Sequence, residues 1–206
     1  MKLESWKLRD VIMMALLGVV FAILYLAVFY LGLSLSTALT PLGFADFGFE
    51  LIYGVWFMAS TLAAYIIRKP GAALITEVLA SVVELLLGNS GGMTVVLTGL
   101  IQGLGAELVF AAFRYKKWDL TSLTLASFAS AVFIYLYELY YLQYYMLTIP
   151  MQLAHIAIRF VSAFVFSALI VKLAGDGLAK TGVVKSYAIG ANIKTAKVYE
   201  EEEEEA

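Results

Sequence analysis

The sequence predicts an all-α integral membrane protein with six transmembrane helices, and three observations support this fold class. Of its 206 residues, 62% are hydrophobic and 15% are charged, whereas soluble domains average about half apolar and a quarter charged. Apolar stretches of about 20 residues, the length needed to cross a bilayer, recur along the chain. All three prolines, Pro41, Pro70 and Pro150, fall in the turns between these stretches, where a missing backbone donor is least costly.

Six stretches are candidate spans. The first follows the polar N-terminus MKLESWKLRD, is longer than the ~7–15 residues of a signal-peptide core, and lacks a cleavage site, so we expect it to be retained. The expected spans are residues 10–32, 48–67, 71–88, 94–113, 121–147 and 151–174. The long connection between the first two, residues 33–47, is either a lid or a passive loop.

The chain divides into one domain and a tail. We expect a six-helix transmembrane domain over residues 1–185 and a polar tail over 186–206. The tail ends in a run of glutamates, a like-charge block that cannot pack and is therefore expected to be disordered.

Basic residues predict the orientation of the spans. Of the fourteen Lys and Arg residues, all but Arg159 fall on one side of the six-span layout. The turns on the other side, such as GNSGG at residues 88–92 and LTIP at 147–150, contain none. By the positive-inside rule, both termini are expected in the cytosol and the chain in the plasma membrane.

The sequence also lacks the motifs of several function classes. It has no cysteine and one histidine, and it contains no phosphate-binding loop, H-E-x-x-H or G-x-S-x-G motif. We therefore expect no enzyme activity, no metal site and no cofactor, and active transport would require ATPase partners.

Carboxylates inside the spans indicate a site, because ionisable groups in a membrane face the protein interior or a water-filled cavity. Glu77 and Glu84 are seven residues apart, so they share a helix face and lie about 10 Å apart along it. We interpret Glu77, near the midplane, as the partner of Arg159 in a structural ion pair, with Glu138 as the alternative partner. Glu84 and Glu138 have no basic residue on their side of the membrane, so we expect them to attract a cation.

Other polar and aromatic groups fall in the same outer region by helical spacing. They are Glu50, Tyr53 and Trp56 at the start of the second span, Asn89 after the third, Gln102 on the fourth, Tyr141 and Tyr145 on the fifth, and His155 on the sixth. The tyrosines are either an interfacial belt or rings that hold a cation. An aromatic, acidic pocket of this kind suits a small cationic heterocycle.

The first span carries a face of small residues. Ala15, Gly18 and Ala22 lie on one side of the helix, with Gly18 and Ala22 spaced as G-x-x-x-A. Such a face allows close approach of two membrane helices, either within the bundle or at a docking surface for another subunit.

The layout and the stretch ELIYGVWFMASTLAAYIIRKPGAALITEVLASVVELLLGN, residues 50–89, resemble the S components of energy-coupling factor (ECF) transporters, most closely the YkoE type, assigned to thiamine or its hydroxymethylpyrimidine precursor. The resemblance implies an ECF S-component-like bundle that binds the vitamin from outside and associates with a transmembrane coupling (T) subunit and two cytosolic ATPase subunits. It also implies a carboxylate for the aminopyrimidine, rings for stacking and polar groups from the last helices. By position these roles fall to Glu84 or Glu138, to Trp56, Tyr141 or Tyr145, and to His155, Gln102 and Asn89.

Two other function classes stay open at this point. One is a stand-alone cation or proton channel, or a secondary carrier, that uses Glu77, Glu107 and Arg159 as a relay. The other is an intramembrane enzyme, which is disfavoured because the acids accompany no nucleophile or metal motif.

Overall fold

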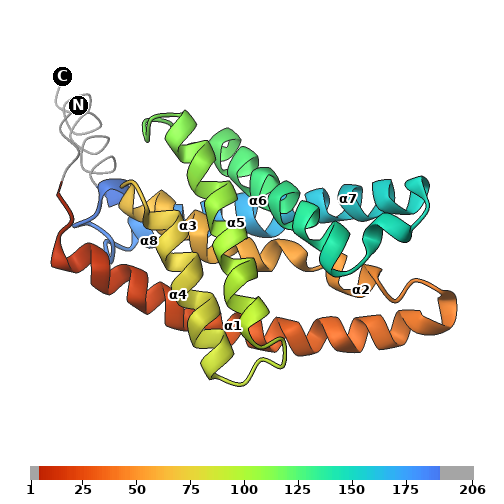
Figure 1. Ribbon diagram of the computed structural model, residues 1–206. Coiled ribbons are helices and arrows are strands. Elements are labelled where there is room, and N and C mark those ends of the chain that lie inside the picture. The colour runs from red at the N-terminus through yellow and green to blue at the C-terminus, as the bar shows by residue number, and fades with distance from the viewer. Residues whose placement is uncertain (1–4, 191–206) are drawn as a thin grey trace.

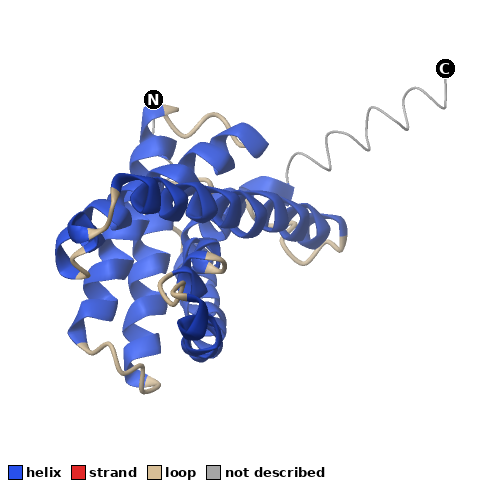
Figure 2. Cartoon of the chain, turned by 90° about the vertical axis from the view of Figure 1, so that its right-hand side faces the viewer, coloured by secondary structure: helices blue, strands red, loops and turns tan. Residues whose placement is uncertain are grey.

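The computed structural model describes residues 5–190, which form helices and connecting turns without a strand (Figures 1 and 2). Its α-helices are α1 (Leu8–Leu39), α2 (Phe47–Glu50), α3 (Met58–Ile67), α4 (Ala72–Leu86), α5 (Met93–Ala112), α6 (Leu120–Tyr141), α7 (Ile149–Ala163) and α8 (Val171–Lys180). The 3-10 helices are η1 (Thr40–Leu42), η2 (Tyr53–Phe57) and η3 (Tyr144–Met146), and η4 (Phe164–Ile170) is a π-helix. The acidic run of the expected tail lies outside the described residues.

Within residues 5–190, four helices are long and apolar enough to cross a membrane. They are Leu8–Leu42, Met93–Ala112, Leu120–Tyr141 and Ile149–Lys180, in which adjoining helices count as one. The apolar helix Tyr53–Ile67 is shorter, and α4 has 15 residues, below the ~17–25 of a usual spanning helix. The all-α class and the membrane-spanning character are confirmed, whereas the count of six spans stays a prediction.

The second expected span is not one helix. Residues 48–67 divide into α2, η2 and α3, and the break places backbone directly against backbone. Gly54 of η2 donates its N–H to Oγ of Ser162 at 2.9 Å, and a Cβ at Gly54 would collide with the Ser162 carbonyl. The expected lid is also mostly helical, because α1 continues to Leu39 and leaves only a short turn before α2.

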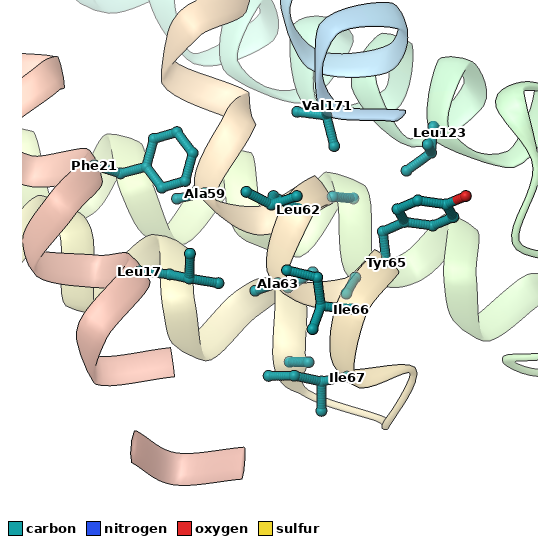
Figure 3. Close-up of a cluster of buried hydrophobic side chains, with 14 of the residues drawn as sticks. Leu17, Phe21, Ala59, Leu62, Ala63, Tyr65, Ile66, Ile67, Leu123 and Val171 are labelled. Carbon is teal, nitrogen blue, oxygen red and sulfur yellow. The ribbon is translucent and has the colours of Figure 1, made fainter. Parts of the chain in front are cut away.

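Helix α3 forms the centre of the bundle. Every residue from Ala59 to Ile67 is buried, and α1, α4, α8 and η4 pack around it. Figure 3 shows Leu62 and Ile66 of α3 among apolar side chains from α1 and α6, including Phe21 and Leu123. A helix that is apolar on all sides is suited to this central position.

The two ends of the described chain meet at one end of the bundle, at the left in Figure 1. Lys69, just before α4, contacts Asp10 of α1 at 2.7 Å and donates to the carbonyl of Ser5. The hydroxyl of Tyr187 donates to the carbonyl of Arg9. We call this the terminal end.

A carboxylate from another helix caps α4 at the terminal end. Glu107 of α5 accepts hydrogen bonds from the backbone N–H groups of Gly71, Ala73 and Leu74, at 2.6, 3.1 and 3.3 Å. The hydroxyl of Tyr115 donates to the same carboxylate at 2.8 Å. These N–H groups have no partner within their own helix, and a negative charge is favourable there.

The small face of α1 packs mainly inside the bundle. Gly18 and Ala22 are buried, and a Cβ at Gly18 would lie 3.0 Å from Cβ of Leu79 on α4. Of the two alternatives for this face, internal packing or a docking surface, the structure shows internal packing at Gly18 and Ala22, since both are buried and Gly18 lies against α4. Ala15 is exposed and remains a candidate.

Candidate functional site

A cavity of about 260 Å³ lies at the end of the bundle opposite the terminal end. Because α4 and α6 lead away from the terminal end, their last turns reach this region, which we call the cavity end. Glu84 and Asn89 come from the end of α4 and the following turn, Thr94 from the start of α5, and Glu138 from the last turn of α6. Its volume is close to the lower limit of ligand pockets, ~300 Å³, so it suits a small molecule.

Aromatic rings form one wall of the cavity. Tyr53 and Trp56 line it together because residues three apart are eclipsed on a 3-10 helix, here η2. The Trp56 ring centroid lies 5.8 Å from that of Tyr53 and 6.2 Å from that of Phe49. Phe29 of α1 and Tyr144 of η3 complete this wall, which offers flat surfaces for a heterocycle or a cation.

Glu84 is a carboxylate of the cavity wall that lacks a basic partner. Its side chain is 1% exposed, and one oxygen accepts a hydrogen bond from Nδ2 of Asn89 at 2.7 Å. The backbone N–H of Gly91 donates to Oδ1 of Asn89, which fixes the orientation of this amide. No salt bridge reaches Glu84 from any residue in the described range 5–190, so its charge is open to a ligand.

Glu138, by contrast, has a hydrogen-bond donor at Oε1 and an ion-pair contact, without a hydrogen bond, at Oε2. The Tyr53 hydroxyl donates to Oε1 at 2.5 Å, and Nη2 of Arg159 lies 2.6 Å from Oε2. Arg159 also binds Glu50 with two contacts, Nε to Oε2 at 2.7 Å and Nη2 to Oε1 at 2.5 Å. Its guanidinium carbon lies 3.8 Å from the Tyr53 ring centroid, so the guanidinium is fixed from three sides.

His155 and Glu50 lie behind the cavity wall. Both are fully buried, and neither lines the cavity. Nδ1 of His155 lies 3.5 Å from Oε1 of Glu50, and its ring packs edge-on against Phe47 and Tyr144. Glu50 and His155 therefore support the wall through Arg159 and Tyr144.

The predicted ion pair between Glu77 and Arg159 is wrong. Glu77 accepts hydrogen bonds from the Tyr25 hydroxyl at 3.0 Å and from the backbone N–H of Ser60 at 2.8 Å. It therefore satisfies the N-terminus of α3, as Glu107 does for α4. Arg159 pairs instead with Glu50 and with Glu138, the alternative partner.

Tyr141 and Tyr145 do not line the cavity. They are 53% and 55% exposed, and they pack against neighbouring tyrosines on the surface. Helix α6 ends at Tyr141, and Gln143 then has a left-handed backbone with φ of 59°. This turn directs Tyr144 into the bundle, so extrapolating one helix through residue 147 selected the wrong tyrosines.

The structure brings six of the ten expected ligand-binding residues together at the cavity. They are Glu84, Glu138, Trp56, Gln102, Asn89 and Tyr53. Sequence reasoning missed Phe29, Phe49 and Tyr144 as wall residues. No spacing signal points to Phe29 or Phe49, because the turn between α1 and α2 decides their approach.

A second cavity of about 210 Å³ lies between α6 and α7. Its walls are mainly apolar, and Arg159 and Tyr135 contribute its polar groups together with Gln152. Nη1 of Arg159 has no hydrogen-bond partner. Within residues 5–190, no group of three or more His, Cys, Asp and Glu side chains is arranged to hold a metal ion.

Comparison with known proteins defines the class. A family model described as "ABC-type cobalt transport system, permease component" matches residues 9–133. A solved structure described as "Crystal structure of an S-component of ECF transporter" has a TM-score of 0.91 and 39% identity, covering 97% of this chain and 98% of that chain. The chain belongs to the S components of ECF transporters.

A relative narrows this assignment to the YkoE type. The chain is 40% identical over 192 residues to a protein of Bacillus subtilis (strain 168) that carries the name "Putative HMP/thiamine permease protein YkoE". The match covers 93% of this chain and 94% of that protein. These relatives are transport proteins rather than enzymes, in agreement with the expectation from the sequence.

Proposed function

We propose that this chain is the substrate-capture component of an ECF-type importer and that it binds thiamine or hydroxymethylpyrimidine in the cavity lined by Glu84 and Trp56. The observation that carries this proposal is a small aromatic cavity whose wall contains a buried carboxylate with no basic partner. The name of the YkoE relative supports the choice of vitamin.

The chemistry of the wall fits such a ligand. Thiamine has a permanent positive charge on its thiazolium ring, which a buried carboxylate attracts. Its aminopyrimidine presents donor and acceptor edges that match the Glu84 carboxylate and the amides of Asn89 and Gln102. The rings of Trp56 and Tyr53 supply stacking surfaces.

The proposed orientation opens the cavity to the outside. The basic turns after α3 and after α5 lie at the terminal end with the described chain ends, so the positive-inside rule assigns this end to the cytosol. The cavity then faces outward in the plasma membrane, as vitamin capture requires.

Delivery of the vitamin is proposed to require a T subunit and two cytosolic ATPase subunits. Ala15 is the member of the small face of α1 that stays exposed, so a partner helix can approach there. Ala15→Leu should reduce uptake in cells that express the whole transporter and leave vitamin binding by the purified chain unchanged. Normal uptake by Ala15→Leu would place the docking surface elsewhere.

Calorimetry tests the substrate directly. Purified chain in detergent should bind thiamine or hydroxymethylpyrimidine with micromolar or tighter affinity, and choline, a cation without a heterocycle, serves as the control. Absence of binding to both vitamin compounds would refute the substrate assignment.

The alternative of a stand-alone channel or carrier has less support. Glu77, Glu107 and Arg159 each have fixed partners, and no hydrogen bond or ion pair of the described chain joins these three groups into a relay. Ion or thiamine flux in liposomes that contain this chain alone would favour the alternative.

A further inference from the structure

A buried cluster that reaches from the cavity wall into the protein contains two carboxylates and one guanidinium. Glu50, Glu138 and Arg159 are 0%, 6% and 1% exposed, respectively. They are joined by contacts of 2.5–2.7 Å, and two carboxylates share one guanidinium. With His155 counted as neutral, Glu50, Glu138 and Arg159 together have a formal charge of −1.

The excess charge is directed at the cavity. Glu50 holds two atoms of the guanidinium, Nε and Nη2, whereas Glu138 shares only Nη2 with it. Glu138 lines the cavity and Glu50 does not. An uncompensated buried charge is costly, and its field is strong in a medium of low dielectric constant.

We propose that the ligand itself supplies the missing positive charge, so that the Glu50–Arg159–Glu138 cluster makes the site select a cation over a neutral molecule of the same shape. This inference rests on the proposed function and adds to it a specificity device. Glu50 and Arg159 act as positioning residues, since they set the charge and the orientation of Glu138 without touching the ligand.

The roles of the two wall carboxylates then differ. Glu84 has only neutral protein donors, the amide of Asn89 and the indole of Trp56, so its charge remains available for a hydrogen bond from the ligand. Glu138 has both oxygens engaged by Tyr53 and Arg159, so it acts on the ligand mainly through its charge. Thiamine engages both carboxylates, whereas neutral hydroxymethylpyrimidine engages only Glu84.

The test compares thiamine with a neutral isostere whose thiazolium nitrogen is replaced by carbon. The two ligands have nearly the same shape, so the ratio of their Kd values reports charge recognition alone. Binding of both ligands is measured by calorimetry at the same pH. The wild-type chain should prefer thiamine by roughly tenfold or more, as expected for a unit charge at this depth.

Glu50→Gln is the decisive variant because it neutralises the cluster without changing a cavity residue. It should reduce the preference for thiamine to near unity and leave the Kd of the neutral isostere within about twofold, because that ligand does not sense the charge. A merely structural role of Glu50 would weaken both ligands equally and would overturn the proposal.

Two further variants complete the experiment. Glu107→Gln makes the same chemical change at the terminal end, where Glu107 caps α4, and should keep the wild-type preference. The double variant Glu50→Gln/Arg159→Gln restores a cluster charge of −1 at Glu138, so its preference for thiamine should return. If Glu50→Gln alone fails to fold, this double variant still tests the proposal. A preference that stays lost in a double variant that binds the isostere would overturn the proposal.

The outcomes separate this inference from the proposed function. Thiamine binding with an equal preference in wild type and Glu50→Gln refutes the charge-selecting role and leaves vitamin capture intact. A wild-type chain that binds none of thiamine, its isostere and hydroxymethylpyrimidine refutes both.

Discussion

The two ends of the bundle treat buried carboxylates differently. At the terminal end, Asp10 has Lys69 and Glu107 has the N-terminus of α4, so each negative charge has a local positive partner. At the cavity end, Glu84 has only neutral donors, the amide of Asn89 and the indole of Trp56, and two carboxylates share Arg159. A buried carboxylate thus indicates a site only when the fold leaves its charge uncompensated.

The largest effect on stability is expected from removing the shared cation. Arg159→Met leaves Glu50 and Glu138 buried without a counter-charge, which should lower the free energy of unfolding by roughly 3–5 kcal/mol. Unfolding by denaturant in detergent micelles measures this change. Lys116→Met, at an exposed position of the terminal end, should change stability by less than about 0.5 kcal/mol.

If Arg159→Met costs no more than the Lys116 control, the charges at the cavity end are already compensated in another way. The two ends would then not differ in how they compensate buried carboxylates.

The next effect falls on binding and contrasts two glutamates of one helix. Glu84→Gln removes the open charge of the cavity wall and should weaken thiamine binding roughly tenfold to a hundredfold, the size of a hydrogen bond to a charged group. Stability should be unchanged or higher, because a buried charge is removed.

Glu77→Gln is the matched control, since it makes the same change seven residues earlier on α4. Glu77 bonds Tyr25 and the backbone of Ser60, so the variant should lose stability and keep its thiamine affinity. Calorimetry measures the thiamine affinity of both variants, and unfolding by denaturant measures their stability. Weaker thiamine binding by Glu77→Gln than by Glu84→Gln would contradict the assigned roles.

A smaller loss of stability is expected at the terminal end. Glu107→Gln retains the shape of the cap on α4 but removes its charge, and we expect a cost of roughly 1–3 kcal/mol with thiamine affinity unchanged. Asp46→Asn, an equal change at an exposed position, should cost less than about 0.5 kcal/mol. Equal stabilities of the two variants would show that the charge of Glu107 contributes nothing to the cap.

Hydropathy and helical periodicity were sufficient to predict the class of the fold and much of the cavity. Glu84 and Glu138 are close to the ends of long, regular helices, where depth and face follow from residue number alone. Tyr53 and Trp56 keep a common face in η2 because their spacing of three suits a 3-10 helix as well as an α-helix.

The remaining features depend on packing that no local pattern encodes. The expected depth of Glu77 in the membrane made it a reasonable partner for Arg159. Which carboxylate pairs with Arg159 depends, however, on which helices are in contact, and α2 places Glu50 against the guanidinium. The burial of Gly18 likewise depends on α4 packing against α1, since a small face suits an internal and an external neighbour equally.

The smallest expected effect concerns the end of α6, where the helix stops before the last tyrosines. Tyr144 lines the cavity and is buried, whereas Tyr141 is exposed on the other side of the turn at Gln143. Tyr144→Leu should weaken thiamine binding roughly threefold to tenfold through loss of a ring contact of about 0.5–1.5 kcal/mol. Tyr141→Leu, measured by the same calorimetry, should bind like wild type, and the opposite ranking would mean that α6 continues as a helix past Tyr141 when the vitamin is bound.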